Sequence, residues 1–199
     1  MSVERKEGRK PLLVFCHGLG GAKNAGIIDQ LYHALDFSAV RFDFSGFGDA
    51  TKPFTGLQDR VLQLKTILDT IDEDVVLVGH SLGGTTALLA QHPRITARVI
   101  IAAPTKPELL RENSRIIPGA KMTDATGREY VITELFVSEI KTLRIPLSTQ
   151  PLLAVYGSKD VTVPITHSPT SPIVVLDDHD FEDTATEIVK YITHFLETL

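Results

Sequence analysis

The segment Gly79-His80-Ser81-Leu82-Gly83 places a serine between two glycines, and it follows the apolar run 75–78 directly. A strand that turns sharply into a helix presents such a serine at the turn, and small neighbours allow the flanking backbone to approach closely. The free N–H groups at the start of the helix favour negative charge there. The spacing therefore predicts that Ser81 is a nucleophile on a strand–helix turn.

A serine hydroxyl is a weak nucleophile near neutral pH, so it needs a base that is oriented by an acid. After a nucleophile of this kind, the acid comes next along the chain and the histidine last. Asp160 follows the apolar run 152–156, and His179 follows the run 173–176. Because parallel strands end at one edge of a sheet, we expect Asp160 and His179 to meet Ser81. His167 is the alternative base.

Short apolar runs of strand length must position these residues. The runs are rich in β-branched residues and apolar on both sides, which is typical of parallel strands that are covered on both faces. They are Pro11–Cys16, Ala39–Phe44, Val75–Val78, Arg98–Ala102, Leu152–Tyr156 and Ile173–Leu176.

Helical periodicity separates the runs, because apolar residues recur there at intervals of three and four. The predicted helical segments are Ile27–Leu35, Leu57–Ile71, Thr85–Ala90 and Phe181–Leu199. This alternation predicts an α/β fold, with a doubly wound, mostly parallel sheet of about six strands and right-handed crossovers.

Residues 104–150 interrupt the alternation, with a hairpin predicted over Lys121–Tyr130 and a helix over Glu129–Leu143. Two interpretations stay open for this stretch. It is an ordinary crossover with one helix, or it is a small lid that faces the substrate. Since the sequence contains no linker or internal repeat, we expect a single domain over residues 1–199 that includes this insertion.

Composition excludes several classes of protein. The chain has 199 residues, 43% of them hydrophobic, which is too apolar for a disordered chain. Its 20 basic and 25 acidic residues give a net charge of −5, which argues against nucleic acid or an anionic membrane as a partner. The charged start of the chain lacks a signal peptide, and no apolar run reaches a membrane span of roughly 18 residues. We therefore expect a cytoplasmic protein.

Metal and thiol chemistry are not expected. The single cysteine, Cys16, lies in a buried-looking run and excludes internal disulfides and zinc sites with several cysteines. The 7 histidines lack the spacing of a ligand set, so we predict neither a metal nor a cofactor.

The chain resembles the α/β-hydrolase superfamily of serine hydrolases over residues 11–199. The residues that carry the resemblance are His17-Gly18-Leu19-Gly20-Gly21, Arg41-Phe42-Asp43-Phe44-Ser45-Gly46-Phe47-Gly48, the motif around Ser81, Gly157-Ser158-Lys159-Asp160, and His179. Among members of the superfamily, the short chain with its insertion is most similar to small carboxylesterases, which include acyl and cinnamoyl esterases.

The resemblance implies a Ser81–His179–Asp160 triad and an oxyanion hole formed by the backbone N–H groups of Leu19 and Leu82. It also implies substrate contacts near His17, Gly18 and His80, and a site without a large cap domain. The implied activity is hydrolysis of small carboxylic esters without a cofactor.

Other functions remain open. A thioesterase or an amide or peptide hydrolase uses the same triad, and a hydrolase-like binding protein lacks catalysis. A dinucleotide-binding oxidoreductase is disfavoured, because Lys23 stands where the third glycine of G-x-G-x-x-G belongs. Oligomeric state is not predicted.

Overall fold

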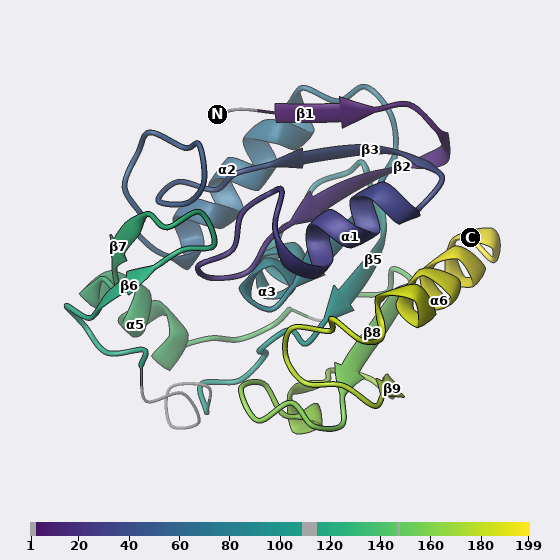
Figure 1. Cartoon of the computed structure of the whole chain (residues 1–199). Helices are drawn as coiled ribbons and strands as arrows, with labels where there is room; N and C mark the ends of the chain where they lie inside the picture. Colours follow the sequence, from purple (N-terminus) through teal and green to yellow (C-terminus); the bar gives the residue numbers. More distant parts are fainter. Residues whose placement is uncertain (1–2, 109–114, 147) are drawn as a thin grey trace.

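A computed structural model describes residues 3–108, 115–146 and 148–199. Its main feature is a seven-stranded sheet in the order β1-β3-β2-β4-β5-β8-β9 (Figure 1). The strands are β1 (Val3–Lys6), β2 (Arg9–Cys16), β3 (Phe37–Phe42), β4 (Val75–His80), β5 (Ile95–Ile101), β8 (Leu152–Gly157) and β9 (Ile173–Val175). All neighbours pair in parallel except β1 and β3, so the predicted doubly wound, mostly parallel sheet is confirmed.

The sheet has one strand more than the six predicted from apolar runs. The additional strand is β1, which pairs antiparallel with β3 at the edge, from Val3 opposite Phe42 to Lys6 opposite Ala39. Its sequence, Val-Glu-Arg-Lys, has one apolar residue, and its side chains are exposed or half-buried. An exposed edge strand needs no apolar run, so the pattern used for the other six could not detect it.

Helices cover both faces of the sheet. They are α1 (Gly26–Ala34), α2 (Leu57–Asp69), α3 (Leu82–Leu89) and α6 (Ala185–Glu197). Helix α1 packs beside α6 on one face, and α2 packs beside α3 on the other (Figure 1). The central strands are consequently buried on both sides, which explains their continuous apolar sequences.

The chain between β5 and β8 holds a two-stranded hairpin and a helix. The hairpin joins β6 (Lys121–Thr123) to β7 (Glu129–Val131), and α5 (Glu134–Lys141) follows. The prediction of a helix from residue 129 was wrong at its start, because residues 129–131 pair with β6. Helix α5 begins after Thr133, whose hydroxyl accepts the Phe136 N–H at 3.0 Å. Residues 109–114 and 147 of the predicted insertion lie outside the described part.

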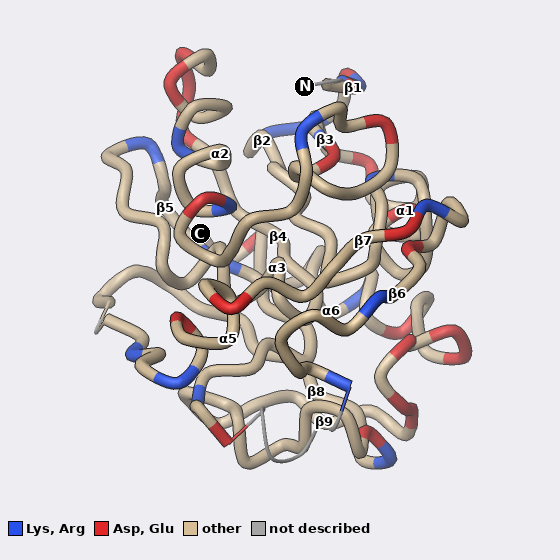
Figure 2. The backbone as a smooth tube through the Cα atoms, turned by 90° about the vertical axis from the view of Figure 1, so that its left-hand side faces the viewer, with Lys and Arg blue, Asp and Glu red and all other residues tan. Residues whose placement is uncertain are grey.

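The hairpin and α5 lie on the side of the molecule toward which β2 and β3 point (Figure 1). Figure 2 views this side directly and shows basic and acidic residues mixed around the outside of the backbone. None of the helices in the described part of the chain is long and apolar enough to cross a membrane.

Candidate active site

The candidate nucleophile lies where the order of strands in the sheet reverses. From β2, the chain continues to β3 on one side and reaches β4 on the other, and in α/β sheets such a point forms a crevice at the carboxyl ends of the strands. The loop after β2 carries Leu19, and the turn after β4 carries Ser81.

Ser81 has a strained backbone, with φ 52° and ψ −126°, between β4 and α3. The turn is possible only with small neighbours. A Cβ at Gly79 would lie 2.5 Å from the Gly83 carbonyl oxygen, and one at Gly83 would lie 2.0 Å from the Cys16 carbonyl oxygen. The Ser81 N–H donates to the Ile101 carbonyl at 2.8 Å, which fixes the turn against β5.

Three side chains from separate loops form a continuous line of hydrogen bonds. Ser81 Oγ lies 3.0 Å from His179 Nε2, and His179 Nδ1 lies 2.7 Å from Asp160 Oδ2. A neutral imidazole donates from one nitrogen and accepts at the other. With Nδ1–H directed at the carboxylate, Nε2 is free to accept the Ser81 hydroxyl proton.

The backbone of its own loop holds the Asp160 carboxylate. Its other oxygen accepts the N–H groups of Thr162 and Val163, both at 2.8 Å. The Asp160 side chain is fully buried, whereas His179 keeps 19% of its surface exposed. The rival His167 lies elsewhere, and its Nδ1 accepts the Thr105 N–H at 3.2 Å.

The two residues expected to form the oxyanion hole, Leu19 and Leu82, lie in the glycine-rich loop and at the start of α3. Leu82 is the first residue of α3, and the first N–H groups of a helix have no acceptor within the helix. Leu19 lies in the tight turn that the Gly21 N–H closes on the Gly18 carbonyl at 3.3 Å. Both residues line a cavity together with Ser81.

Comparison with known proteins assigns the chain to a family. A model of the alpha/beta hydrolase family matches residues 13–196. The chain belongs to the alpha/beta hydrolase family. The predicted resemblance is thereby confirmed, and the match covers every strand of the sheet except β1 and the start of β2. No curated protein sequence matched.

Solved structures of other alpha/beta hydrolase fold proteins superpose over nearly the whole chain. Est1E from Butyrivibrio proteoclasticus, with ferulic acid bound, has a TM-score of 0.81 at 18% identity, over 99% of this chain and 94% of that one. Mouse alpha/beta hydrolase domain-containing protein 10 has a TM-score of 0.75 at 21% identity, over 98% and 93%. The monoacylglycerol lipase of Paleococcus ferrophilus has 0.69 at 18%, over 100% and 99%. At these identities, the likeness shows the fold.

His80, at the variable position of the motif in this alpha/beta hydrolase, contacts the loop of the candidate base. Its Nε2–H donates to the His179 carbonyl at 2.9 Å, and the two rings lie 5.0 Å apart. Burial and the neighbouring His179 lower the pKa of His80 to about 3, so the ring is neutral in ordinary buffers. The ring also lines a cavity beside Ser81, and a contact with substrate stays a prediction.

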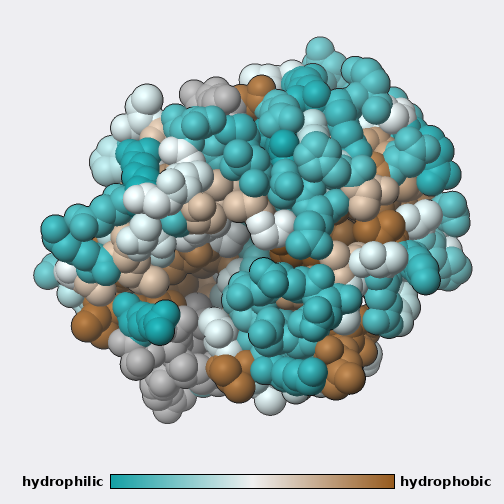
Figure 3. All heavy atoms as spheres, in the orientation of Figure 1, coloured by the Kyte–Doolittle hydropathy of each residue, from teal (hydrophilic) through white to brown (hydrophobic). Residues whose placement is uncertain are grey.

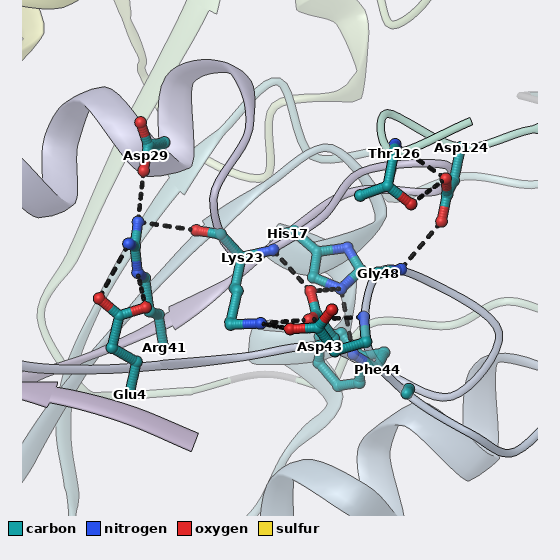
Figure 4. Close-up of polar contacts among 12 residues, drawn as sticks. Glu4, His17, Lys23, Asp29, Arg41, Asp43, Phe44, Gly48, Asp124 and Thr126 are labelled. Carbon is teal, nitrogen blue, oxygen red and sulfur yellow. Dashed lines mark hydrogen bonds and ion pairs between the residues drawn. The ribbon is translucent and has the colours of Figure 1, made fainter. Parts of the chain in front are cut away.

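His17 is buried, and both of its ring nitrogens contact the backbone. Its Nδ1–H donates to the Gly18 carbonyl at 2.8 Å, and its Nε2 accepts the Phe44 N–H at 3.1 Å (Figure 4). Burial, together with the Arg60 guanidinium, lowers the pKa of His17 to about 3. The ring therefore fixes the start of the glycine-rich loop, whereas the predicted substrate contacts of His17 and Gly18 stay predictions.

Arg60 is a buried cation that the sequence analysis missed. It donates to the His17 carbonyl, and its guanidinium lies 3.8 Å from the centre of the Phe44 ring. Burial lowers the pKa of Arg60 to about 9, which leaves it charged at neutral pH. Its place three residues after Leu57 and four before Leu64, on the apolar face of α2, was the signal of its burial.

A second buried network holds the far end of the glycine-rich loop. Asp43 accepts the Lys23 N–H at 2.7 Å and the Lys23 ammonium at 2.8 Å, while Arg41 donates to the Lys23 carbonyl at 3.1 Å (Figure 4). Burial alone would raise the pKa of Asp43, but the hydrogen bonds from Lys23 hold it below its ordinary value. Asp43 is one of the residues that carry the family resemblance, but no sequence pattern indicated that it pairs with Lys23.

Ser81 lines two cavities. The glycine-loop cavity, of about 200 Å³, is bounded by residues 17–21, residues 25–28, Ala125 and Asp180. The hairpin cavity, of about 140 Å³, lies toward β6, β7 and α5. Both are lined by Leu19, Ser81 and His179. Figure 3 shows a hollow with a hydrophobic floor on the side of the molecule that carries the hairpin.

Other chemistries find less support. Burial raises the pKa of the Cys16 thiol to about 12, so this side chain stays protonated in the core. Among the described residues, no group of three or more His, Cys, Asp or Glu side chains is arranged to hold a metal ion.

Proposed function

We propose that this chain is a serine hydrolase that cleaves small carboxylic esters through an acyl-enzyme on Ser81. The observation that carries the proposal is the line of hydrogen bonds from Asp160 through His179 to Ser81, at 2.7 and 3.0 Å. Family membership supports hydrolysis as the reaction class. Est1E was solved with ferulic acid, which supports including esters of aromatic acids among the candidate substrates.

In the first half of the reaction, Ser81 Oγ attacks the acyl carbon while His179 Nε2 takes the hydroxyl proton. The carbonyl oxygen becomes negatively charged and accepts the N–H groups of Leu19 and Leu82. Losing one such donor typically costs about 3 kcal/mol of transition-state stabilisation. The bond to the alcohol oxygen then breaks, and His179 returns the proton to the departing alcohol.

In the second half, a water molecule attacks the acyl group on Ser81 and gives a proton to His179. The carboxylic acid leaves as the serine oxygen regains its proton from His179. Asp160 holds the imidazole in the tautomer that this cycle requires, and it stabilises the imidazolium ion that forms in both halves.

The test is a substrate panel with one acyl group in three linkages: a p-nitrophenyl ester, a thioester and an anilide. We expect the ester to be hydrolysed with the highest kcat/KM, and Ser81→Ala to reduce kcat by about 10⁴-fold or more. A preference for the thioester or the anilide would replace the ester assignment. Equal turnover by wild type and Ser81→Ala would contradict the mechanism.

A further inference from the structure

The hairpin cavity has a mostly apolar wall, with the reacting groups at its base. Its wall is formed by residues between β5 and β6, by the β6–β7 hairpin, by α5 and by the loop after β8. The residues that form this wall are Pro104, Ile116, Met122, Tyr130, Phe136, Thr162 and Val163. Ser81, Leu82, Leu19 and His179 complete the lining, so a group seated in the cavity is next to the bond that the proposed reaction breaks.

The aromatic part of the wall is packed from behind. The Tyr130 ring lies 4.9 Å from Phe47, and the Phe136 ring lies 5.2 Å from Phe54, both measured between ring centres. Phe136 and Phe47 are completely buried. These rings cannot move away from the cavity without displacing the rings behind them, because protein interiors are close-packed.

The hairpin itself is attached to the loop that carries Leu19. The Ala125 N–H donates to the Gly20 carbonyl at 2.8 Å. Asp124 accepts the Gly48 N–H at 2.9 Å (Figure 4). Arg128 donates to the Ala50 carbonyl. The turn between β6 and β7 is therefore hydrogen-bonded to two loops of the sheet edge, and the cavity has a fixed wall.

The cavity volume limits what can enter. An apolar cavity of about 150 Å³ in a protein core accommodates one benzene molecule. The hairpin cavity, at about 140 Å³, has room for one six-membered ring or a short branched chain. Met122 is the half-buried, flexible member of the wall, and its thioether lies 3.5 Å from the Tyr130 hydroxyl.

We propose that the hairpin cavity selects esters in which one half is a single ring or a short branched chain, and that Met122 sets the upper limit of its size. The inference rests on the proposed function of Ser81. The other half of the ester then occupies the larger glycine-loop cavity, which Ser81 also lines.

Two substrate series test the selection. One varies the acyl group from acetate through butyrate, benzoate and octanoate at a fixed p-nitrophenyl alcohol. The other varies the alcohol from methyl to octyl at a fixed acetyl group, with acid release as the readout. We expect kcat/KM in one series to peak at butyrate or a single ring and then fall about 10-fold for each further step in size.

Met122→Ala should move the maximum of that same series toward longer chains, and Met122→Phe should move it toward acetate. Leu135→Ala is the matched control, since Leu135 belongs to α5 but is 56% exposed. It should leave both series unchanged.

Two different failures can be told apart. If the wild type hydrolyses esters through Ser81 but Met122→Ala leaves both size profiles unmoved, the cavity assignment is wrong and the proposed function stands. If the wild type hydrolyses no member of either series, the proposed function fails, and the inference fails with it.

Discussion

His80 joins the nucleophile turn to the loop of the candidate base. Its Nε2–H holds the His179 carbonyl at 2.9 Å, and Phe181 packs against the ring with 6.0 Å between ring centres. Phe181 itself has a left-handed backbone, with φ 55°, so this loop is strained beside the site. We infer that His80 acts as a positioning residue for His179.

Glutamine and leucine at position 80 separate this role from packing. The side-chain amide of Gln can replace the Nε2–H donor, whereas Leu cannot. We expect His80→Leu to lower kcat by about 10- to 100-fold with little change in KM, and His80→Gln to recover most of the loss. Equal kcat values for the two variants, measured on a short p-nitrophenyl ester, would rule the hydrogen bond out.

Site residues differ in how far the sequence predicts them. Ser81, Asp160 and His179 follow from a local motif and from the order of groups at strand ends, which are properties of the sequence. Arg60 and Asp124 act on backbone groups of residues 17 and 48, which are distant along the chain. No local pattern records such a partner, so only the fold identifies them.

The β6–β7 hairpin combines two roles in one element, because it forms a cavity wall and braces the glycine-rich loop. Asp124 is its principal polar anchor, with one oxygen accepting Thr126 and Arg128 N–H groups and the other accepting Gly48 N–H. Burial would raise the pKa of Asp124, but these hydrogen bonds hold it below its ordinary value. The side chain is therefore a carboxylate at neutral pH.

Asp124→Asn tests whether the hairpin supports the proposed oxyanion hole. An amide cannot accept at both ends, so one anchor is lost. We expect kcat to fall by about 10-fold with KM nearly unchanged, and a trifluoromethyl ketone inhibitor to bind about 10-fold more weakly. The inhibitor is informative because its bound form carries an oxyanion, so its affinity reports on the oxyanion hole. A general loss of stability would not weaken inhibitor binding to the folded protein.

Glu129→Gln is the control for this experiment. Glu129 belongs to the same hairpin but forms an exposed ion pair with Lys121 at 2.9 Å. Its substitution should leave kcat and inhibitor affinity unchanged. A folded Asp124→Asn protein with wild-type inhibitor affinity would show that the hairpin does not position the hole.

Elements were predicted well where burial dictates the pattern. The six apolar runs correspond to the strands β2, β3, β4, β5, β8 and β9, and the central ones are buried on both faces. The start of α5 was missed because β7 and the helix share an apolar rhythm across residues 129–143, and a cap at Thr133 separates them. The edge strand β1 was missed because its exposed and half-buried side chains need no apolar run.

The folded protein keeps two histidines neutral, the buried His17 and the half-buried His80. Burial lowers the pKa values of His17 and His80 from 6.5 to about 3. In the unfolded chain these side chains bind protons as the pH falls through 6.5, whereas the folded protein binds them only near pH 3. As the pH is lowered, the unfolded state therefore gains protons first. The free energy of unfolding consequently decreases as the pH falls from about 6.5 toward 3.

Urea unfolding measures this effect. We expect the free energy of unfolding to fall by on the order of 5 kcal/mol between pH 7 and pH 4.5 when both rings contribute, before most carboxylates titrate. His80→Gln should show a shallower fall, because glutamine does not titrate. The exposed His194→Gln should match the wild-type slope. An unfolding free energy independent of pH across this window would contradict the neutral state of both rings.

The proposed nucleophile is tested most directly by covalent capture. A fluorophosphonate reacts with an activated serine and not with an ordinary surface hydroxyl. Peptide mass analysis of the labelled wild type should locate one adduct on Ser81, and Ser81→Ala should take up no label. Undiminished labelling of Ser81→Ala, or an adduct on another residue of the wild type, would contradict the proposed mechanism.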